Sequence, residues 1–196
     1  MALADGRIWV IDVEGNGASP PEIVELAMVE VANLSITGNQ RHWLIRPQQP
    51  IAPVASRIHG LTDVDVANAP SMDDIADSIL PLIEETPIAG HNVRVEVDIL
   101  ARSLPDWVPS VAIDTLKLAR ALRPGLDSYA LAKLGVQFGF EREATDRSGS
   151  HHHAALFDAT LTALIFIDLI HGIPESRRQA AILGADILNL KQGFLL

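Results

Sequence analysis

A short apolar segment that ends in two carboxylates constrains this chain more than any other part of the sequence. Ile8–Val13 is rich in β-branched residues and predicts a buried strand, but Asp12 and Glu14 stand at its end. Because side chains alternate along a strand, the two acids point to the same face. Two neighbouring carboxylates repel unless a cation lies between them, and hard oxygen ligands suit Mg²⁺ or Mn²⁺ better than zinc. The segment predicts either such a site or a strand end that runs into a polar loop, and alone it is a weak signal.

The composition limits the class of protein. The chain has 196 residues, of which 48% are hydrophobic, and this length fits one domain with a sizeable core. It has no cysteine, which excludes disulfides and thiolate metal sites and fits a reducing cytoplasm. No segment has the pattern of a signal peptide or a membrane span, so we expect no membrane partner.

The net charge of −10 argues at first against nucleic acid as a partner. The acid is unevenly spread: it dominates residues 1–93, whereas acids and bases balance over residues 94–147. Some of the acid in the first half could be metal ligand. The charge therefore decides little by itself.

Hydropathy and turn residues predict three strands, followed by helices that alternate with two shorter strands. The predicted strands cover 8–14, 23–31, 41–47, 87–90 and 111–114, and the predicted helices begin near 71, 92, 115, 128, 153 and 174. Gly38-Asn39 is typical of a hairpin turn, whereas 51–65 and 144–150 are expected to be loops, the second one mobile. This order of elements indicates an α/β fold with a mixed sheet and helices on both sides.

The predicted helix after Asn92 carries two acids, Glu96 and Asp98. Residues two apart on a helix differ by about 200° in direction, so only one of them can face a given site. A solvated helix face with two acids is the plain alternative. Asn92 itself is a residue type that caps helix N-termini.

Three histidines, His151, His152 and His153, precede a strongly apolar helix that contains Asp158. A charge in such an apolar setting needs a partner. A histidine at the junction of a loop and a helix can act as a general base near neutral pH. Three adjacent histidines also suggest a transition-metal site, although neighbours on a short loop cannot easily all face one ion.

Taken together, these positions resemble the motifs of the DnaQ-type, or DEDDh, 3′–5′ exonucleases. The likeness runs from Ile8 to about Ile170, and several motifs in the right order are far more specific than any one of them. The segments that carry it are Asp12-Val13-Glu14, Ile58–Thr62, His91-Asn92-(x)3-Glu96, Ile113–Arg120 and His153-(x)4-Asp158.

The resemblance implies a ribonuclease-H-like fold, with a mixed five-stranded sheet made of a three-stranded antiparallel meander plus two parallel strands. It also implies an enzyme that hydrolyses phosphodiester bonds from the 3′ end, using two Mg²⁺ or Mn²⁺ ions, and releases nucleoside 5′-monophosphates. The implied metal ligands are Asp12, Glu14, Glu96 and Asp158, and His153 is the implied general base. The implied substrate contacts are Gly15, Asn16, Gly17, His59 and Asn92, although His59 could equally anchor its loop.

The sequence departs from the family pattern at three places. Gly15 stands where threonine usually follows the first-motif Glu, and Ala18 stands where some relatives place a larger apolar residue. The second-motif acid is normally Asp, and here it is Glu96, which is one methylene longer. If this change abolished catalysis, the chain would be a nucleic-acid-binding or protein-binding module.

We expect an exonuclease domain over 1–173 and a C-terminal helical extension over 174–196, in a cytoplasmic protein that serves DNA repair. The expected partner is a nucleic-acid 3′ end. DNA is preferred over RNA because 114–120 and 151–168 resemble a deoxyribonuclease branch of the family, and an exoribonuclease of the same fold is the alternative. A homodimer and association with a polymerase both stay open.

Overall fold

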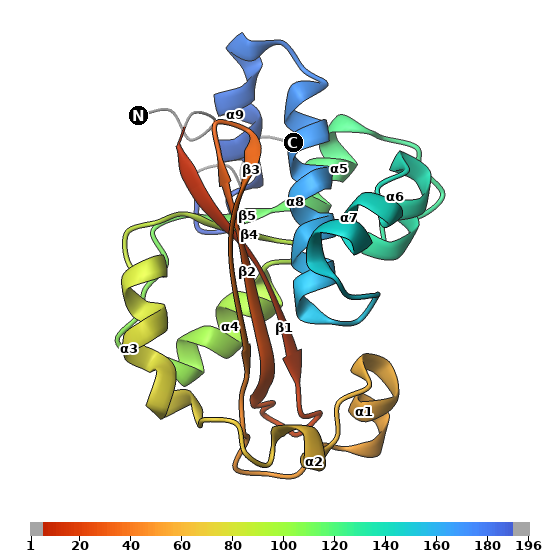
Figure 1. Ribbon diagram of the computed structural model, residues 1–196. Coiled ribbons are helices and arrows are strands. Elements are labelled where there is room, and N and C mark those ends of the chain that lie inside the picture. The colour runs from red at the N-terminus through yellow and green to blue at the C-terminus, as the bar shows by residue number, and fades with distance from the viewer. Residues whose placement is uncertain (1–5, 190–196) are drawn as a thin grey trace.

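One mixed five-stranded sheet organises the computed structural model, which describes residues 6–189 of the chain (Figure 1). The strand order is β3-β2-β1-β4-β5; β1, β2 and β3 are antiparallel, whereas β4 and β5 run parallel to β1. This topology confirms the predicted meander with two added parallel strands. The strands are β1 (Arg7–Gly15), β2 (Ile23–Ala32), β3 (Ser35–Leu44), β4 (Ile88–Gly90) and β5 (Ala112–Asp114).

Helices cover both faces of the sheet (Figure 1). On one face α8 packs directly against β1 and β2, and α5, α6 and α7 pack around it. On the other face lie α3 and α4, while α1 and α2 lie beyond the ends of the long strands. The helices are α1 (Pro53–His59), α2 (Asp63–Val66), α3 (Met72–Ile83), α4 (Arg94–Ser103), α5 (Thr115–Leu122), α6 (Leu131–Phe138), α7 (Glu141–Ser148), α8 (Ala155–His171) and α9 (Glu175–Ala185).

The alternation of side chains along β1 divides the core into two layers. Ile8 and Val10 are buried in the core that contains α8, whereas Trp9 is buried in the core that contains α3 and α4. Each fully buried side chain of this size stabilises the fold by about 1.5–3 kcal/mol. Asp12 and Glu14 continue the alternation of Ile8 and Val10, so both carboxylates face the α8 side of the sheet.

The start of α3 confirms a prediction from the sequence. Ser71 Oγ accepts a hydrogen bond from the Asp74 backbone N–H at 3.4 Å, and Asp74 Oδ2 accepts one from the Ser71 backbone N–H at 2.9 Å. This reciprocal pair is a capping box, and it satisfies two donors that a helix start leaves free.

The hairpin between β2 and β3 differs from the prediction. The turn lies at Asn33-Leu34, whose φ angles of 51° and 55° suit a two-residue hairpin turn, and Ala32 pairs with Ser35. Gly38, which we expected in the turn, lies within β3 at φ 84°, where the register of the strand pair shifts. The strand therefore begins six residues earlier than its alternating apolar pattern indicates.

Two segments that we expected to be loops contain helices instead. The connection over 51–65 forms α1 and most of α2, and the polar stretch over 144–150 is mostly the second half of α7. In α7 only Ala144 is buried, so no apolar stripe marks the helix in the sequence, and the pairs Arg142–Asp146 and Glu143–Arg147 support its exposed face.

The end of the described chain packs on the same sheet. α9 contacts α5 and β5, and Asp186 forms an isolated bridge with Ile113 on β5. The boundary at 173 stays a prediction, and the part of the predicted extension over 190–196 lies outside the described residues. Within 6–189, no helix has the length and apolar character that a membrane crossing requires.

Candidate active site

Four carboxylates from β1, α4 and α8 converge near the end of β1, with Asp12 at the centre. Burial raises the pKa of Asp12 well above its ordinary value, and the charges of Glu96, Asp158, Glu14 and Glu25 raise it further. The fold thus brings together the four acids that the sequence predicted as metal ligands.

Glu96 faces this cluster, and Asp98 does not. Glu96 is buried on α4, and burial, with the charges of Asp114 and Glu14, raises its pKa to about 8. Asp98 is exposed on the other side of the helix. Only one of the two acids therefore faces the cluster, as the helical offset predicts, and it is Glu96, which the resemblance implied.

Asn92 has a different position from the predicted helix cap. The N-cap of α4 is Val93, and Asn92 adopts a left-handed conformation with φ 69°. Its backbone N–H donates to Asp114 Oδ1 at 3.1 Å, and its side chain is exposed at the turn before α4. The prediction of a cap was wrong, whereas the exposed amide keeps Asn92 available for a ligand.

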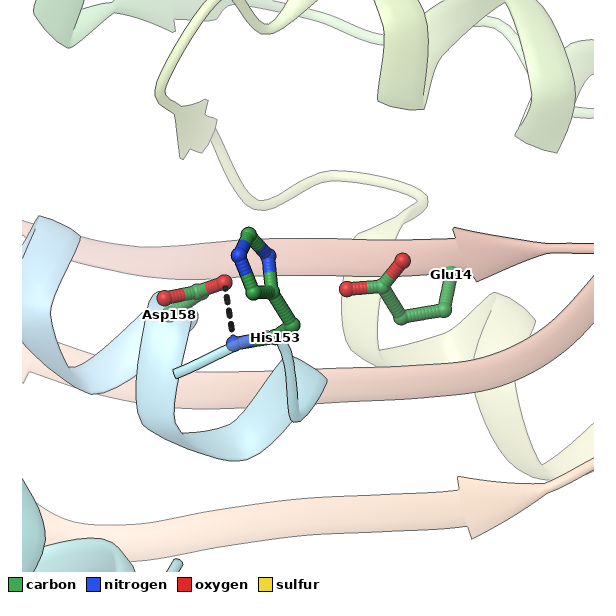
Figure 2. A group of neighbouring side chains, drawn as sticks. All are labelled: Glu14, His153 and Asp158. Atoms are coloured by element: carbon green, nitrogen blue, oxygen red, sulfur yellow. Dashed lines mark hydrogen bonds between the residues drawn. The ribbon is translucent and has the colours of Figure 1, made fainter. Parts of the chain in front are cut away.

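His153 lies between the carboxylates of Glu14 and Asp158 (Figure 2). One potential ligand atom from each of the three side chains lies within 4.8 Å of the other two. His153 precedes α8 instead of forming its first turn, and it has a left-handed φ of 63°. Its backbone N–H donates to Asp158 Oδ2 at 3.2 Å, so the acid on the helix holds the segment that carries the histidine.

The other two histidines have different surroundings. His152 Nδ1 lies 3.4 Å from Asp158 Oδ1, its Nε2 lies 3.3 Å from Glu141 Oε1, and its ring packs edge-on against Phe157. His151 is exposed to solvent. These contacts do not support a transition-metal site made by the three histidines together.

The turn after β1 is held by Asn16. Its side chain is fully buried: Oδ1 accepts from the N–H groups of Ala18 and Glu22 at 3.1 and 2.9 Å, and Nδ2 donates to the Gln49 carbonyl at 3.2 Å. Because no part of the Asn16 side chain reaches solvent, it does not contact substrate as the sequence predicted. Its role is to hold the turn.

Gly15 and Gly17, on either side of Asn16, differ in their exposure and in the space available for a side chain. A Cβ on Gly17 would lie 3.0 Å from Ala55 Cβ and 3.1 Å from Ala52 Cβ, and its φ of 75° also favours glycine. Gly17 is exposed, and Gly15 is half-buried. The turn therefore packs tightly against α1 while part of its backbone stays open to a ligand.

His59, at the end of α1, presents a buried donor toward this turn. Its Nδ1 accepts from the Leu61 backbone N–H at 3.1 Å, which leaves the proton of the neutral ring on Nε2. Within the described chain Nε2 is buried and forms no hydrogen bond of good geometry, although the Gly15 backbone lies close enough to favour the charged ring. Burial lowers the pKa of His59, so the neutral ring is favoured.

Two buried acids near the site were missed by the sequence analysis. Asp114 caps α5, because its Oδ1 accepts from the Leu116 N–H at 2.9 Å as well as from Asn92. Glu25 lies opposite Glu14 in the sheet. Glu25 is one of two acids in a strand that is otherwise apolar, and this was the signal that could have identified it.

The carboxylates fit a divalent cation on three grounds. Burial raises the pKa of Glu14 to about 8, with the charges of Asp158 and Glu25 adding to the shift, and it raises the pKa of Asp158. Among the described residues, the buried Glu96 Oε2 accepts no hydrogen bond, and the buried Asp158 Oδ1 has only the 3.4 Å contact with His152 Nδ1. All the donors except the His153 ring are hard oxygens. A cation would supply the positive charge that this cluster lacks.

Comparisons with known proteins identify a family of exonucleases. A family model described as exonuclease (RNase_T) matches residues 9–166. DNA polymerase III subunit epsilon of Rickettsia felis is 32% identical over 177 residues, which cover 85% of this chain and 75% of that protein. Exodeoxyribonuclease 10 of Escherichia coli is 34% identical over 167 residues, which cover 83% of this chain and 68% of that protein.

Solved structures show the same fold. Exonuclease X in complex with 5′ overhanging duplex DNA is 32% identical, has a TM-score of 0.68, and aligns over 90% of this chain and 98% of that one. The nuclease domain of 3′hExo, a DEDDh family member bound to rAMP, has a TM-score of 0.69 over 85% of this chain and 92% of that one, but at 15% identity it supports the fold alone. The chain therefore belongs to the RNase_T family of exonucleases, of the DnaQ or DEDDh type, which act on nucleic acids.

Proposed function

We propose that this protein is a metal-dependent 3′–5′ exonuclease that removes nucleoside 5′-monophosphates from the 3′ end of DNA. The observation that carries the proposal is the convergence of Asp12, Glu14, Glu96 and Asp158, all with raised pKa values, beside His153. Clustered carboxylates are costly without a cation, so their arrangement is best explained by one or more bound ions. Two Mg²⁺ or Mn²⁺ ions match the number of acids.

The four carboxylates would hold the ions in a site that is built from three separate elements. When bound, the ions would neutralise the phosphate, lower the pKa of a water molecule and stabilise the leaving oxygen. Glu96 would be a metal ligand at the position where the family usually has Asp. Its buried Oε2, which accepts no hydrogen bond within the described chain, supports this role.

His153 would act as the general base. A neutral ring nitrogen would take the proton from a water molecule as its oxygen attacks phosphorus. The bond from phosphorus to the 3′-oxygen of the preceding nucleotide would then break, and that oxygen would gain a proton from solvent. The position of the His153 ring between Glu14 and Asp158, outside the helix and exposed, supports this role.

The terminal nucleotide would lie against the turn after β1 and the end of α1. The buried Nε2–H of His59 lies beside the Gly15 backbone without a hydrogen bond of good geometry in the described chain, and Gly17 of the same turn is exposed. Asn92 contributes an exposed amide from the turn before α4. Asn16 takes part by shaping the turn.

The preference for DNA rests on relatives. Exodeoxyribonuclease 10 and the structure of Exonuclease X with duplex DNA are two matches whose names point to DNA. The relatives called DNA polymerase III subunit epsilon also make association with a polymerase worth testing, beside self-association.

The test is digestion of 5′-labelled single-stranded DNA and RNA of one sequence, with Mg²⁺ or with EDTA. We expect a ladder that shortens from the 3′ end of DNA, only with Mg²⁺. Digestion of RNA alone would overturn the preferred substrate, and binding without cleavage of either strand would overturn the enzymatic proposal.

The matched variant is Asp12→Asn, and the control is Asp98→Asn. Calorimetry with Mn²⁺ and a nucleoside monophosphate should give a lower stoichiometry or affinity for Asp12→Asn alone, because Asp12 is central to the cluster and Asp98 is exposed. Unchanged Mn²⁺ binding by Asp12→Asn would refute this ligand assignment.

A further inference from the structure

We infer that Glu25, which lies outside the proposed metal ligands, is a positioning residue that holds the start of α8 and thereby sets His153 and Asp158 against Glu14. Only the activity readouts of this inference rest on the proposed function. The contact itself joins β2 to α8 across 130 residues of sequence.

Both oxygens of the Glu25 carboxylate are engaged by the protein. Oε1 lies 2.6 Å from Nε2 of His42 on β3, and Oε2 accepts a hydrogen bond from the Ala155 backbone N–H at 3.1 Å. Glu25 is 5% exposed and its hydrogen bond to Ala155 is buried, whereas the side chain of His42 is 40% exposed. The use of both oxygens distinguishes Glu25 from Glu96, which has a buried oxygen that accepts no hydrogen bond within the described chain.

The start of α8 needs an acceptor from elsewhere. Its N-cap residue is Ala154, which has no polar side chain, and the first helical residue, Ala155, is fully buried. A buried backbone N–H without an acceptor destabilises the segment that carries it. The Glu25 carboxylate satisfies this donor, and its negative charge suits the positive end of the helix dipole.

The position of Ala155 explains why this cap matters for the site. His153 lies two residues before Ala155, and Asp158 lies three residues after it. Glu25 lies opposite Glu14 in the strand pair. Its hydrogen bond to Ala155 therefore connects the part of the sheet that carries Glu14 to the segment that carries His153 and Asp158. Misplacement of reacting groups by about 1 Å can cost about 10²-fold in rate.

The variants that test the inference are Glu25→Ala, Glu25→Gln and the control Glu30→Ala. Glu30 lies on the same strand, is 6% exposed, and pairs with Arg7 and Thr37 instead of α8. Gln retains an oxygen that can accept from Ala155 and an NH₂ group that can donate to a neutral His42 ring. A loss caused by the missing cap should therefore be rescued by Gln.

Hydrogen exchange of the peptide over 149–158 is the first readout, and it needs no activity. Exchange should be at least about tenfold faster in Glu25→Ala than in wild type, and unchanged in Glu30→Ala and Glu25→Gln. Unchanged exchange in Glu25→Ala would overturn the inference, whether or not the wild type cleaves DNA.

The second readout is the split between kcat and KM. Glu25→Ala should lower kcat by about 10²-fold with little change in KM, and Glu25→Gln should regain most of that loss. If Glu25→Ala lost no more kcat than Glu30→Ala at equal loss of Tm, the effect would be general destabilisation and the inference would fail. Absence of cleavage by the wild type would count against the proposed function alone.

Discussion

Glu14 on β1 and Glu25 on β2 lie directly opposite each other in the antiparallel strand pair. Like charges at opposed positions destabilise a sheet, and the protein treats the two differently. Glu25 is bound by His42 and by the Ala155 N–H, whereas burial and neighbouring acids raise the pKa of Glu14 to about 8. One acid of the pair is thus used for structure, and the other is left in a state that a cation would stabilise.

The raised pKa values make the stability of the metal-free protein depend on pH. Folded Glu14 and Glu96 keep their protons up to about pH 8, whereas their ordinary pKa is 4.5. Their contribution to the free energy of unfolding is therefore full below 4.5 and is lost as the pH rises through about 8. Urea unfolding in EDTA at about pH 5, 7 and 8.5 should show this decline.

Glu14→Gln is the control for that measurement. Its side chain is neutral at every pH, so the decline should be shallower than in wild type. The difference between the two proteins removes other contributions, such as those of His59 and His91, whose lowered pKa values act in the opposite direction. Mn²⁺ should restore stability at the highest pH in wild type, and an equally steep decline in Glu14→Gln would contradict the assignment.

Glu96 should matter for activity, and Asp98 should not. Glu96→Gln removes a buried carboxylate whose Oε2 has no partner among the described residues, so the rate should fall by about 10²-fold or more. Asp98→Asn changes an exposed side chain and should have little effect. Full activity in both variants would mean that the site does not need an acid from α4.

The three adjacent histidines should differ in their effects. His153→Ala should lower kcat by about 10²–10⁴-fold and leave Mn²⁺ binding largely intact, as expected for loss of a general base. His152→Ala removes contacts to Asp158 and Glu141 and should lower kcat less than His153→Ala does. His151→Ala changes an exposed side chain and should have the smallest effect on kcat. If His152→Ala were inactive and His153→Ala active, the assignment of the base would be one residue out of place.

Asn16 should contribute to stability more than to contact with substrate. Asn16→Ala leaves the partly buried N–H groups of Ala18 and Glu22 without their acceptor, so the free energy of unfolding should fall by about 1–3 kcal/mol. Asn68→Ala changes an exposed amide and should stay within about 0.5 kcal/mol of wild type. If Asn16→Ala also lowered the free energy of unfolding by no more than about 0.5 kcal/mol, the turn would be stable without the Asn16 side chain.

Much of the site could be predicted because its logic is local. The period of two along β1 put Asp12 and Glu14 on one face, and a helix start was predicted near residue 71, where α3 begins. The helical offset showed that only one of Glu96 and Asp98 can face the site. These relationships involve residues a few positions apart, so the sequence by itself determined them. The three-strand opening of the sheet was readable for the same reason.

Only the tertiary structure decided the rest, because the contacts concerned join residues that are distant in sequence or depend on register. The hairpin turn lies at Asn33-Leu34 and not at Gly38-Asn39, because the pairing of β2 with β3 along their whole length selects the turn. The helix α7 buries a single residue, Ala144, so its sequence has no apolar stripe. The role of Glu25 depends on a helix start 130 residues away. The raised pKa values likewise arise only when folding buries acids from three elements together, since each acid alone in water would titrate normally.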